Sequence, residues 1–196
     1  MVKLFAVMLG GRAAGCNIEL HDVVFVAGES LEETYPLLVN KWFGSPLRLH
    51  IDSTVELTIV DGYEISLTKE KPENGSENTL YFVNFGGYKP NFFGELHEMK
   101  FYVASEKVAV TAKAKKDLCV SLFQQHLDDS IPIDSLCNEN QVDIDAIIPI
   151  RQVDQYYVQL KPTTATATLV IESSYRKLNL SHILEKAQAL KEQQLN

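Results

Sequence analysis

An internal repeat limits the fold of this chain more than any other feature. A shift of 76 positions aligns eight identical residues within 22 ungapped positions, where about one or two would match by chance. A chain that repeats itself in this way is expected to contain two related modules. The matching residues are Leu4, Val7, Gly10, Gly11, Glu19, Leu20, His21 and Phe25 in the first stretch, and Leu80, Val83, Gly86, Gly87, Glu95, Leu96, His97 and Phe101 in the second.

The repeat predicts four segments along the 196 residues. Residues 1–68 form a first module, and residues 79–162 form a second. A polar linker over 69–78 joins them, because this stretch combines charges with proline, asparagine and glycine. Residues 163–196 are expected to supply a C-terminal strand and helix that pack on the body of the protein.

Each module is predicted to run strand, strand, helix, strand, strand. The apolar run 4–9 is typical of a buried strand, and it ends at Gly10 and Gly11. A second strand over about 20–27 precedes Ser30 and Glu33, which form a capping-box pattern. We expect a first turn at 30–34 and a regular helix over about 36–43, with a counterpart over about 106–123.

Two hairpins are expected to close the modules. Asp61 and Gly62 stand between alternating apolar and polar runs and strongly favour a tight hairpin. In the second module Asp154 and Gln155 replace this pair, which predicts a different turn. Pro149 predicts that the preceding strand is at an edge or bulged, since proline cannot donate a ladder hydrogen bond.

The two copies differ by 17 residues. The ungapped alignment continues to His50 and Asp52, which meet His126 and Asp128, and the match then moves to an offset of 93. The extra residues are therefore placed in an acidic insertion near 130–146, which by default is a solvated loop.

The C-terminal segment predicts one more strand and a helix. The threonine-rich run 163–172 favours a strand. Ser181 is expected to cap the helix, with an apolar face formed by Ile183, Leu184, Ala187 and Leu190. Together these elements predict an α+β protein with mainly antiparallel sheets, in which the two modules pack around a pseudo-twofold axis.

The Glu-x-His segments are the strongest candidates for chemistry. Strand alternation places His21 on the same face as Val23 and Phe25, which predicts that the histidine lies on the apolar face. Glu19 points the same way. The second copy repeats this pair as Glu95 and His97.

Two interpretations of these pairs stay open. In the first, each Glu-His pair is a structural brace beneath the glycine loops Gly10-Gly11 and Gly86-Gly87. In the second, His50 and Asp52, or His126 and Asp128 in the other copy, complete a set that could hold a divalent metal ion. The spacing matches no compact zinc motif, so no cofactor is predicted outright, and no catalytic signature names a reaction.

Composition excludes several classes of protein. A formal net charge of -8 without a dense Lys and Arg run opposes nucleic acids and anionic membranes. No apolar stretch approaches the length of a membrane span, and the run 4–9 is short for a signal peptide. Three cysteines at unrelated positions predict reduced thiols in the cytoplasm.

Several segments of the first module resemble a bacterial family catalogued as Domain of Unknown Function 1543. The segments are Leu9-Gly10-Gly11, Glu19-Leu20-His21-Asp22-Val23-Val24-Phe25, Lys41-Trp42-Phe43-Gly44, His50-Ile51-Asp52-Ser53 and Val60-Asp61-Gly62-Tyr63. The resemblance covers most of the chain and implies a small cytoplasmic bacterial protein with one or two copies of the module. It implies no activity, substrate or catalytic residue.

The sequence favours a non-enzymatic binding or assembly protein, since duplication readily makes paired surfaces. A homodimer is compatible with this hypothesis. The alternative is a metal-dependent enzyme built on His21, His50 and Asp52.

Overall fold

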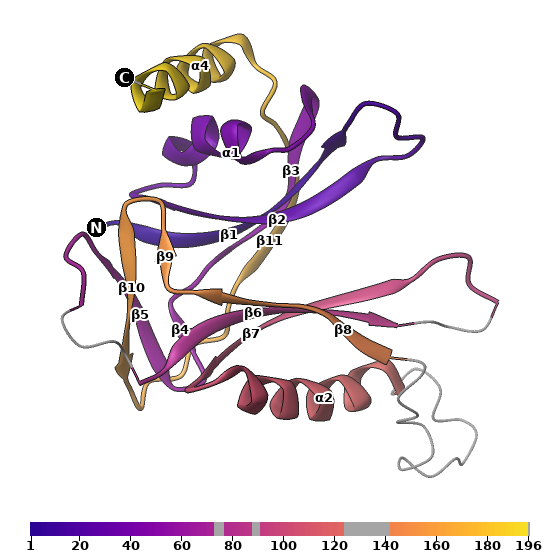
Figure 1. Ribbon diagram of the computed structural model, residues 1–196, viewed down its shortest axis with the longest axis vertical. Coiled ribbons are helices and arrows are strands. Elements are labelled where there is room, and N and C mark those ends of the chain that lie inside the picture. Colours follow the sequence, from indigo (N-terminus) through magenta and orange to yellow (C-terminus); the bar gives the residue numbers. More distant parts are fainter. Residues whose placement is uncertain (73–76, 88–90, 124–141, 196) are drawn as a thin grey trace. The chain divides into compact units, whose positions relative to one another are not determined.

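A computed structural model describes residues 1–72, 77–87, 91–123 and 142–195, and its chain path is shown in Figure 1. The chain divides into two compact units. The first contains Met1–Lys71 and Gln152–Asn196, and the second contains Pro72–Arg151. Each unit is described by itself below.

The first unit is built on a four-stranded sheet in the order β11-β3-β1-β2. Strand β1 (Lys3–Arg12) lies between β2 (Leu20–Gly28) and β3 (Ser45–Glu56), while β11 (Ile171–Lys177) lies at the outer side of β3. Every strand pair in the described part of the chain is antiparallel. The predicted α+β class with mainly antiparallel sheets is confirmed.

Helices cover one face of this sheet. A short 3-10 turn η1 (Glu32–Thr34) leads into α1 (Tyr35–Lys41), and Pro36 lies in the first turn of α1, where its missing N–H is tolerated. The C-terminal helix α4 (Ser181–Leu195) packs against α1 (Figure 1). The core between sheet and helices includes Val7, Leu9, Val24, Val26, Leu38, Trp42, Leu49, Ile51, Leu178 and Ile183.

Ser30 and Glu33 form hydrogen bonds at the start of the first helix, but not the predicted capping box. Ser30 Oγ accepts a hydrogen bond from Glu33 N at 3.4 Å, and the Glu33 carboxylate accepts one from Glu29 N at 3.1 Å. A capping box would need the Glu33 carboxylate on Ser30 N, and the N-cap residues Leu31 and Thr34 make no side-chain cap hydrogen bond.

A second sheet in the first unit joins the hairpins of both predicted modules. Its order is β4-β5-β10-β9, with β4 at Ile59–Val60, β5 at Tyr63–Thr68, β9 at Gln152–Val153 and β10 at Tyr156–Pro162. Asp61 and Gly62 both adopt positive φ, at 50° and 77°, as a type I′ turn requires. In the other hairpin only Asp154 does so, with φ of 53°, so the two turns differ as predicted.

The C-terminal strand begins later than the threonine run suggested. Residues 163–170 are not a strand, and β11 starts at Ile171, so the predicted strand over 163–172 is wrong in its position. Thr163 N instead donates to Gly62 O at 2.8 Å, which ties this stretch to the turn of the first hairpin. Strand propensity is weak beside the availability of a pairing partner, and β11 finds its partner on β3.

The second unit has a three-stranded sheet in the order β7-β6-β8. Its strands are β6 (Thr79–Gly87), β7 (Leu96–Ala104) and β8 (Val142–Ile150), and helix α2 (Lys107–Phe123) packs on them. Tyr81, Val83, Phe85, Tyr102, Val110 and Ala114 form its core. Pro149 lies on β8 at the edge of this sheet, as predicted.

The pairing of β6 with β7 repeats that of β1 with β2 at an offset of 76. Gly10 pairs with His21 and Gly86 pairs with His97. Both central strands also shift register against their other neighbour at equivalent points, between Met8 and Leu9 and between Asn84 and Phe85.

The third strands do not follow the ungapped alignment. Gly10 pairs with His50 on β3, whereas Gly86 pairs with Asp143 on β8. The third strands of the two copies are therefore offset by 93 residues, from His50 to Asp143. The 17 extra residues of the second copy come before β8. His126 and Asp128, the predicted counterparts of His50 and Asp52, lie outside the described residues, as does most of the acidic insertion. Within the described residues, no helix has the length and apolar character needed to cross a membrane.

Candidate metal site

The polar residues singled out in the first module lie around Gly10. In the register of the sheet, Gly10 on β1 pairs with His21 on β2 and with His50 on β3. A Cβ atom at Gly10 would lie only 2.5 Å from His50 Nε2 and 2.6 Å from Asp52 Oδ2. A larger residue here would force both side chains to shift, because they occupy the space that its Cβ atom would need.

This group lies on the face of the sheet opposite the helices. The helix-covered face of β2 carries Val24 and Val26, whereas His21 points the other way and is half exposed. The expectation that His21 lies on the apolar core face is therefore wrong. Both alternating positions of β2 are apolar, so alternation alone does not indicate which face the helices cover.

A bulge places Asp52 in the group. Met8 pairs with Ser53 and Leu9 pairs with Ile51, so Asp52 is the extra residue of β3 at this register shift. A bulge bends its strand and redirects a side chain, and such bulges are common beside functional sites.

Short contacts join the four side chains. His21 Nε2 lies 3.1 Å from Asp52 Oδ2 and 3.6 Å from Glu19 Oε1. His50 Nε2 lies 3.2 Å from Asp52 Oδ1 and 3.5 Å from the same Glu19 oxygen. Ligand-type atoms of Glu19, His50 and Asp52 all lie within 4.8 Å of one another, and His21 on the neighbouring strand contacts this set through Asp52. The structure thus brings together all four candidates of the first module.

The orientation of His50 is set by the backbone of Arg48. His50 Nδ1 lies 2.7 Å from the carbonyl oxygen of Arg48, which can only accept, so Nδ1 carries a hydrogen. Arg48 itself has a φ of 68°, which is unusual for a residue with a side chain. A histidine held through one nitrogen by a carbonyl, with the other nitrogen free to coordinate, is the usual arrangement of a metal ligand.

Hydrogen-bond acceptors converge around His50 Nε2. In a neutral imidazole with hydrogen on Nδ1, Nε2 carries a lone pair. This lone pair faces oxygens of Asp52 and Glu19, which are acceptors as well. The buried Oδ2 atom of Asp52 also has no hydrogen-bond partner within the described residues, although His21 Nε2 is only 3.1 Å away. Acceptors converge in this way when a metal ion, or a proton on the imidazole, lies between them.

Exposure differs across the group. The His50 side chain is 3% exposed, whereas those of Asp52, Glu19 and His21 are 33%, 42% and 49% exposed. One side of the group is therefore closed by protein and the other is open to solvent.

Tyr175 covers His50 and was not predicted from the sequence. Its ring lies 4.3 Å from the imidazole, centroid to centroid, at an interplanar angle of 34°. Tyr175 reaches this position because β11 pairs with β3 and shifts register between Ser173 and Arg176. No local pattern could have indicated this contact, since 125 residues separate the two rings in sequence (175 minus 50).

The second unit holds a smaller version of the group. His97 Nε2 lies 3.7 Å from Glu95, and His97 Nδ1 lies 3.3 Å from the Asn84 amide nitrogen. Gly86 occupies the position of Gly10, and Gly87 that of Gly11. A set with two imidazoles is thus seen only in the first unit, among the residues that the structure describes.

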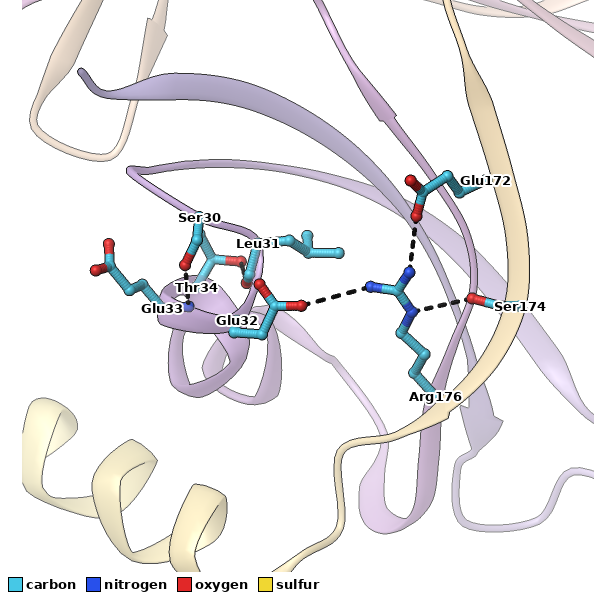
Figure 2. A network of polar contacts seen from close by, with 8 residues as sticks. All are labelled: Ser30, Leu31, Glu32, Glu33, Thr34, Glu172, Ser174 and Arg176. Atoms are coloured by element: carbon cyan, nitrogen blue, oxygen red, sulfur yellow. Dashed lines mark hydrogen bonds and ion pairs between the residues drawn. The ribbon is translucent and has the colours of Figure 1, made fainter.

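A separate polar network surrounds Arg176 on the helix-covered face (Figure 2). The guanidinium lies 2.7 Å from Glu172 and 3.7 Å from Glu32, and it donates to Ser174 Oγ at 3.0 Å. The Tyr35 hydroxyl, and then Glu172, raise the pKa of Arg176 above its usual value. The positive charge of Arg176 is already paired with Glu172 and Glu32, so we interpret this network as a structural link between η1 and β11.

Comparisons with known proteins support the resemblance seen in the sequence. The family model for Domain of Unknown Function (DUF1543) matches residues 16–67, a range that includes all four residues of the candidate site. The chain is also similar to the crystal structure of a protein Il1583 from Idiomarina loihiensis. The two share 36% identity and a TM-score of 0.67, over 91% of this chain and 98% of that chain.

The chain belongs to the DUF1543 family. The family model brings no activity with it, and no curated protein matches the chain. The function of this DUF1543 protein therefore has to be argued from the site itself.

Proposed function

We propose that this protein binds a divalent metal ion through Glu19, His21, His50 and Asp52. The observation that carries the proposal is the convergence of two imidazole nitrogens and two carboxylates around Gly10. The contacts between imidazole and carboxylate atoms are 3.1, 3.2, 3.5 and 3.6 Å. These contacts are similar to the ligand-to-ligand distance of about 3.3 Å expected around one metal ion with bonds of about 2.0 Å. The group whose ligand atoms all lie within 4.8 Å of one another is Glu19, His50 and Asp52.

The donor set favours a particular group of metals. Two nitrogens and two oxygens suit zinc, iron, cobalt or manganese, whereas calcium and magnesium prefer oxygen alone. Neutral imidazoles leave two negative charges on Glu19 and Asp52, which a divalent ion would balance.

The open side of the site supports a second candidate, a metal-dependent enzyme. Structural zinc sites are closed, but catalytic sites keep a position for water or substrate. Glu19 and His21 are more than two-fifths exposed, which leaves such a position accessible. The residues present do not assign a reaction.

A proton on His50 is the competing explanation. An imidazolium would also satisfy Asp52 and Glu19, and the group would then be a structural brace. A brace needs no metal, whereas the proposed site binds one stoichiometrically, so metal content separates the two.

The test uses protein purified without a histidine tag. Metal content is measured by mass spectrometry before and after reconstitution with Zn²⁺ or Co²⁺, for the wild type, His50→Gln and His182→Gln. His182 is an exposed histidine on α4 and serves as the matched control. We expect about one metal ion per chain in the wild type and in His182→Gln, and at least a tenfold loss of affinity in His50→Gln.

Folding is checked by circular dichroism, so that a lost metal is not confused with a lost fold. If the folded wild type binds none of these metals, the proposal fails. It fails equally if folded His50→Gln binds as tightly as the wild type.

We also propose that the two sequence modules, residues 1–68 and 79–162, arose by tandem duplication and that the protein works in a bacterial cytoplasm as a small binding protein. The shared offset of 76 in strand pairing and the equivalent bulges support the duplication. The free thiol of Cys16 suits a reducing compartment. The acidic composition argues against nucleic acid as a partner.

A further inference from the structure

The row of residues that forms the metal site continues onto β11. Lys177 pairs with His50 across β3 and β11, next to the pair of Arg176 with Ile51. Ile51 belongs to the helix-covered core, so Arg176 lies on that face and Lys177 lies on the face of His50. Directly opposed residues in an antiparallel pair have Cβ atoms about 5 Å apart. The sheet therefore places a lysine beside the proposed metal ligand.

Tyr175 and Lys177 flank His50 together. They are two residues apart on β11, which places both on the same face, and the Tyr175 ring stacks on the imidazole. Tyr175 is 61% exposed, so it borders the open side of the site. These two residues therefore lie along one side of His50, and we call them the wall of the site.

Charge balance indicates what this wall would bind. A divalent ion would balance the negative charges of Glu19 and Asp52. The positive charge of Lys177 would then have no partner within the site. Lys3 and Lys41 pair with Glu56 and Asp154, but Lys177 forms no ion pair within the described part of the chain. A metal ion with an accessible position beside a lysine forms a two-point receptor for an anion.

We infer that the site binds a small oxyanion, with one oxygen on the metal ion and another on Lys177. This inference rests on the proposed metal site and names the chemical class of its ligand. Carboxylate and phosphate share the required chemistry, because both present at least two acceptor oxygens that can contact two cations at once.

The experiment uses the Co²⁺-loaded full chain, because the visible absorption of Co²⁺ reports its ligands. Acetate and inorganic phosphate are titrated separately into the wild type, Lys177→Gln and Lys191→Gln. Lys191 is an exposed lysine on α4 and serves as the matched control. Equilibrium dialysis measures the Co²⁺ that stays bound at each anion concentration.

We expect at least one of the two anions to change the Co²⁺ spectrum without removing the ion. Lys177→Gln should lower the affinity for that anion by about tenfold or more, while its affinity for Co²⁺ stays within about twofold of the wild type. Lys191→Gln should behave as the wild type. The anion that binds with the higher affinity, acetate or phosphate, shows whether the site favours a carboxylate or a phosphate ligand.

The outcomes separate this inference from the proposal that it rests on. If the wild type binds no Co²⁺, both fail. If Co²⁺ binds but neither anion changes its spectrum, or the anions only strip the ion, the metal site stands and the oxyanion inference is wrong. It is also wrong if Lys177→Gln binds the anion as tightly as the wild type.

Discussion

Gly10 and His50 pair across β1 and β3 so closely that the imidazole occupies the place of a missing side chain. On the other face of β1, the neighbouring Gly11 leaves room for the ring of Trp42, whose nearest atom would lie 2.9 Å from an added Cβ. Two consecutive glycines thus serve two different faces of one strand.

This difference predicts different effects for two alanine substitutions. Gly10→Ala should lower the free energy of unfolding by about 1 to 3 kcal/mol and also weaken metal binding, because His50 and Asp52 must move. Gly11→Ala should lower stability by a similar amount but leave metal affinity unchanged, since Trp42 is not a ligand. Urea unfolding and Zn²⁺ titration measure the two effects, and equal metal affinity in the two variants would contradict the prediction.

Arg48 is expected to tolerate glycine better than valine. The positive φ of Arg48 disfavours β-branched residues, so Arg48→Val should lower the free energy of unfolding by about 1 to 3 kcal/mol. It should also weaken metal binding, because the Arg48 carbonyl orients His50. Arg48→Gly adopts the same backbone conformation freely and should keep wild-type metal affinity. Urea unfolding and Zn²⁺ titration test the valine and glycine variants. Equal metal affinity in the two would show that the Arg48 carbonyl has no role in orienting His50 for metal binding.

Asp154 is expected to matter more for stability than its partner Lys41. One carboxylate oxygen lies 2.8 Å from Lys41 Nζ, and the other accepts from the backbone N–H of Ala27 at 3.1 Å. Asp154→Ala leaves that partly buried N–H without its acceptor and should cost about 2 to 3 kcal/mol. Asp154→Asn keeps an acceptor and tolerates the positive φ, so it should cost about 1 kcal/mol, as should Lys41→Met. Thermal unfolding ranks the three variants, and a ranking with Lys41→Met lowest in stability would refute this account.

The Arg176 network should contribute little to stability despite its short contacts (Figure 2). Its partners Glu172 and Glu32 are about two-thirds exposed, so Arg176→Lys should cost less than about 1 kcal/mol. A raised pKa in the folded state stabilises the protein at every pH below the usual range of arginine, and the gain is lost only above it. Arg176 itself should therefore add no pH dependence between about pH 5 and 9. Unfolding of the wild type and Arg176→Lys at several pH values measures this, and a difference that changes with pH would contradict it.

Local chemistry predicted the elements well. The Asp61-Gly62 turn requires two positive φ angles that few residue pairs adopt, and the structure has them. Pro149 excludes a central strand position through its missing N–H, and β8 is at an edge. Such features depend on a few neighbouring residues, so they can be read from the sequence.

The parts that the sequence did not predict depend on pairing between distant segments. The pairing of β10 with β5 and of β11 with β3 follows from packing across more than 80 residues of chain, which no periodic pattern encodes. The same holds for the bulge at Asp52 and for the positions of Tyr175 and Lys177. The candidate ligands could be named from the sequence, but the wall beside them could not.

The division of the first unit between two distant stretches of chain has a consequence for synthesis on the ribosome. Strand β11 follows the whole of the second unit in sequence, and it carries Tyr175 and Lys177. The second unit is continuous and can fold while the chain is still being made, but the first sheet waits for its outer strand. Glu19, His21, His50 and Asp52 therefore leave the ribosome well before Tyr175 can cover His50. A metal ion that met the nascent chain would find these four residues without Tyr175 and Lys177 beside them.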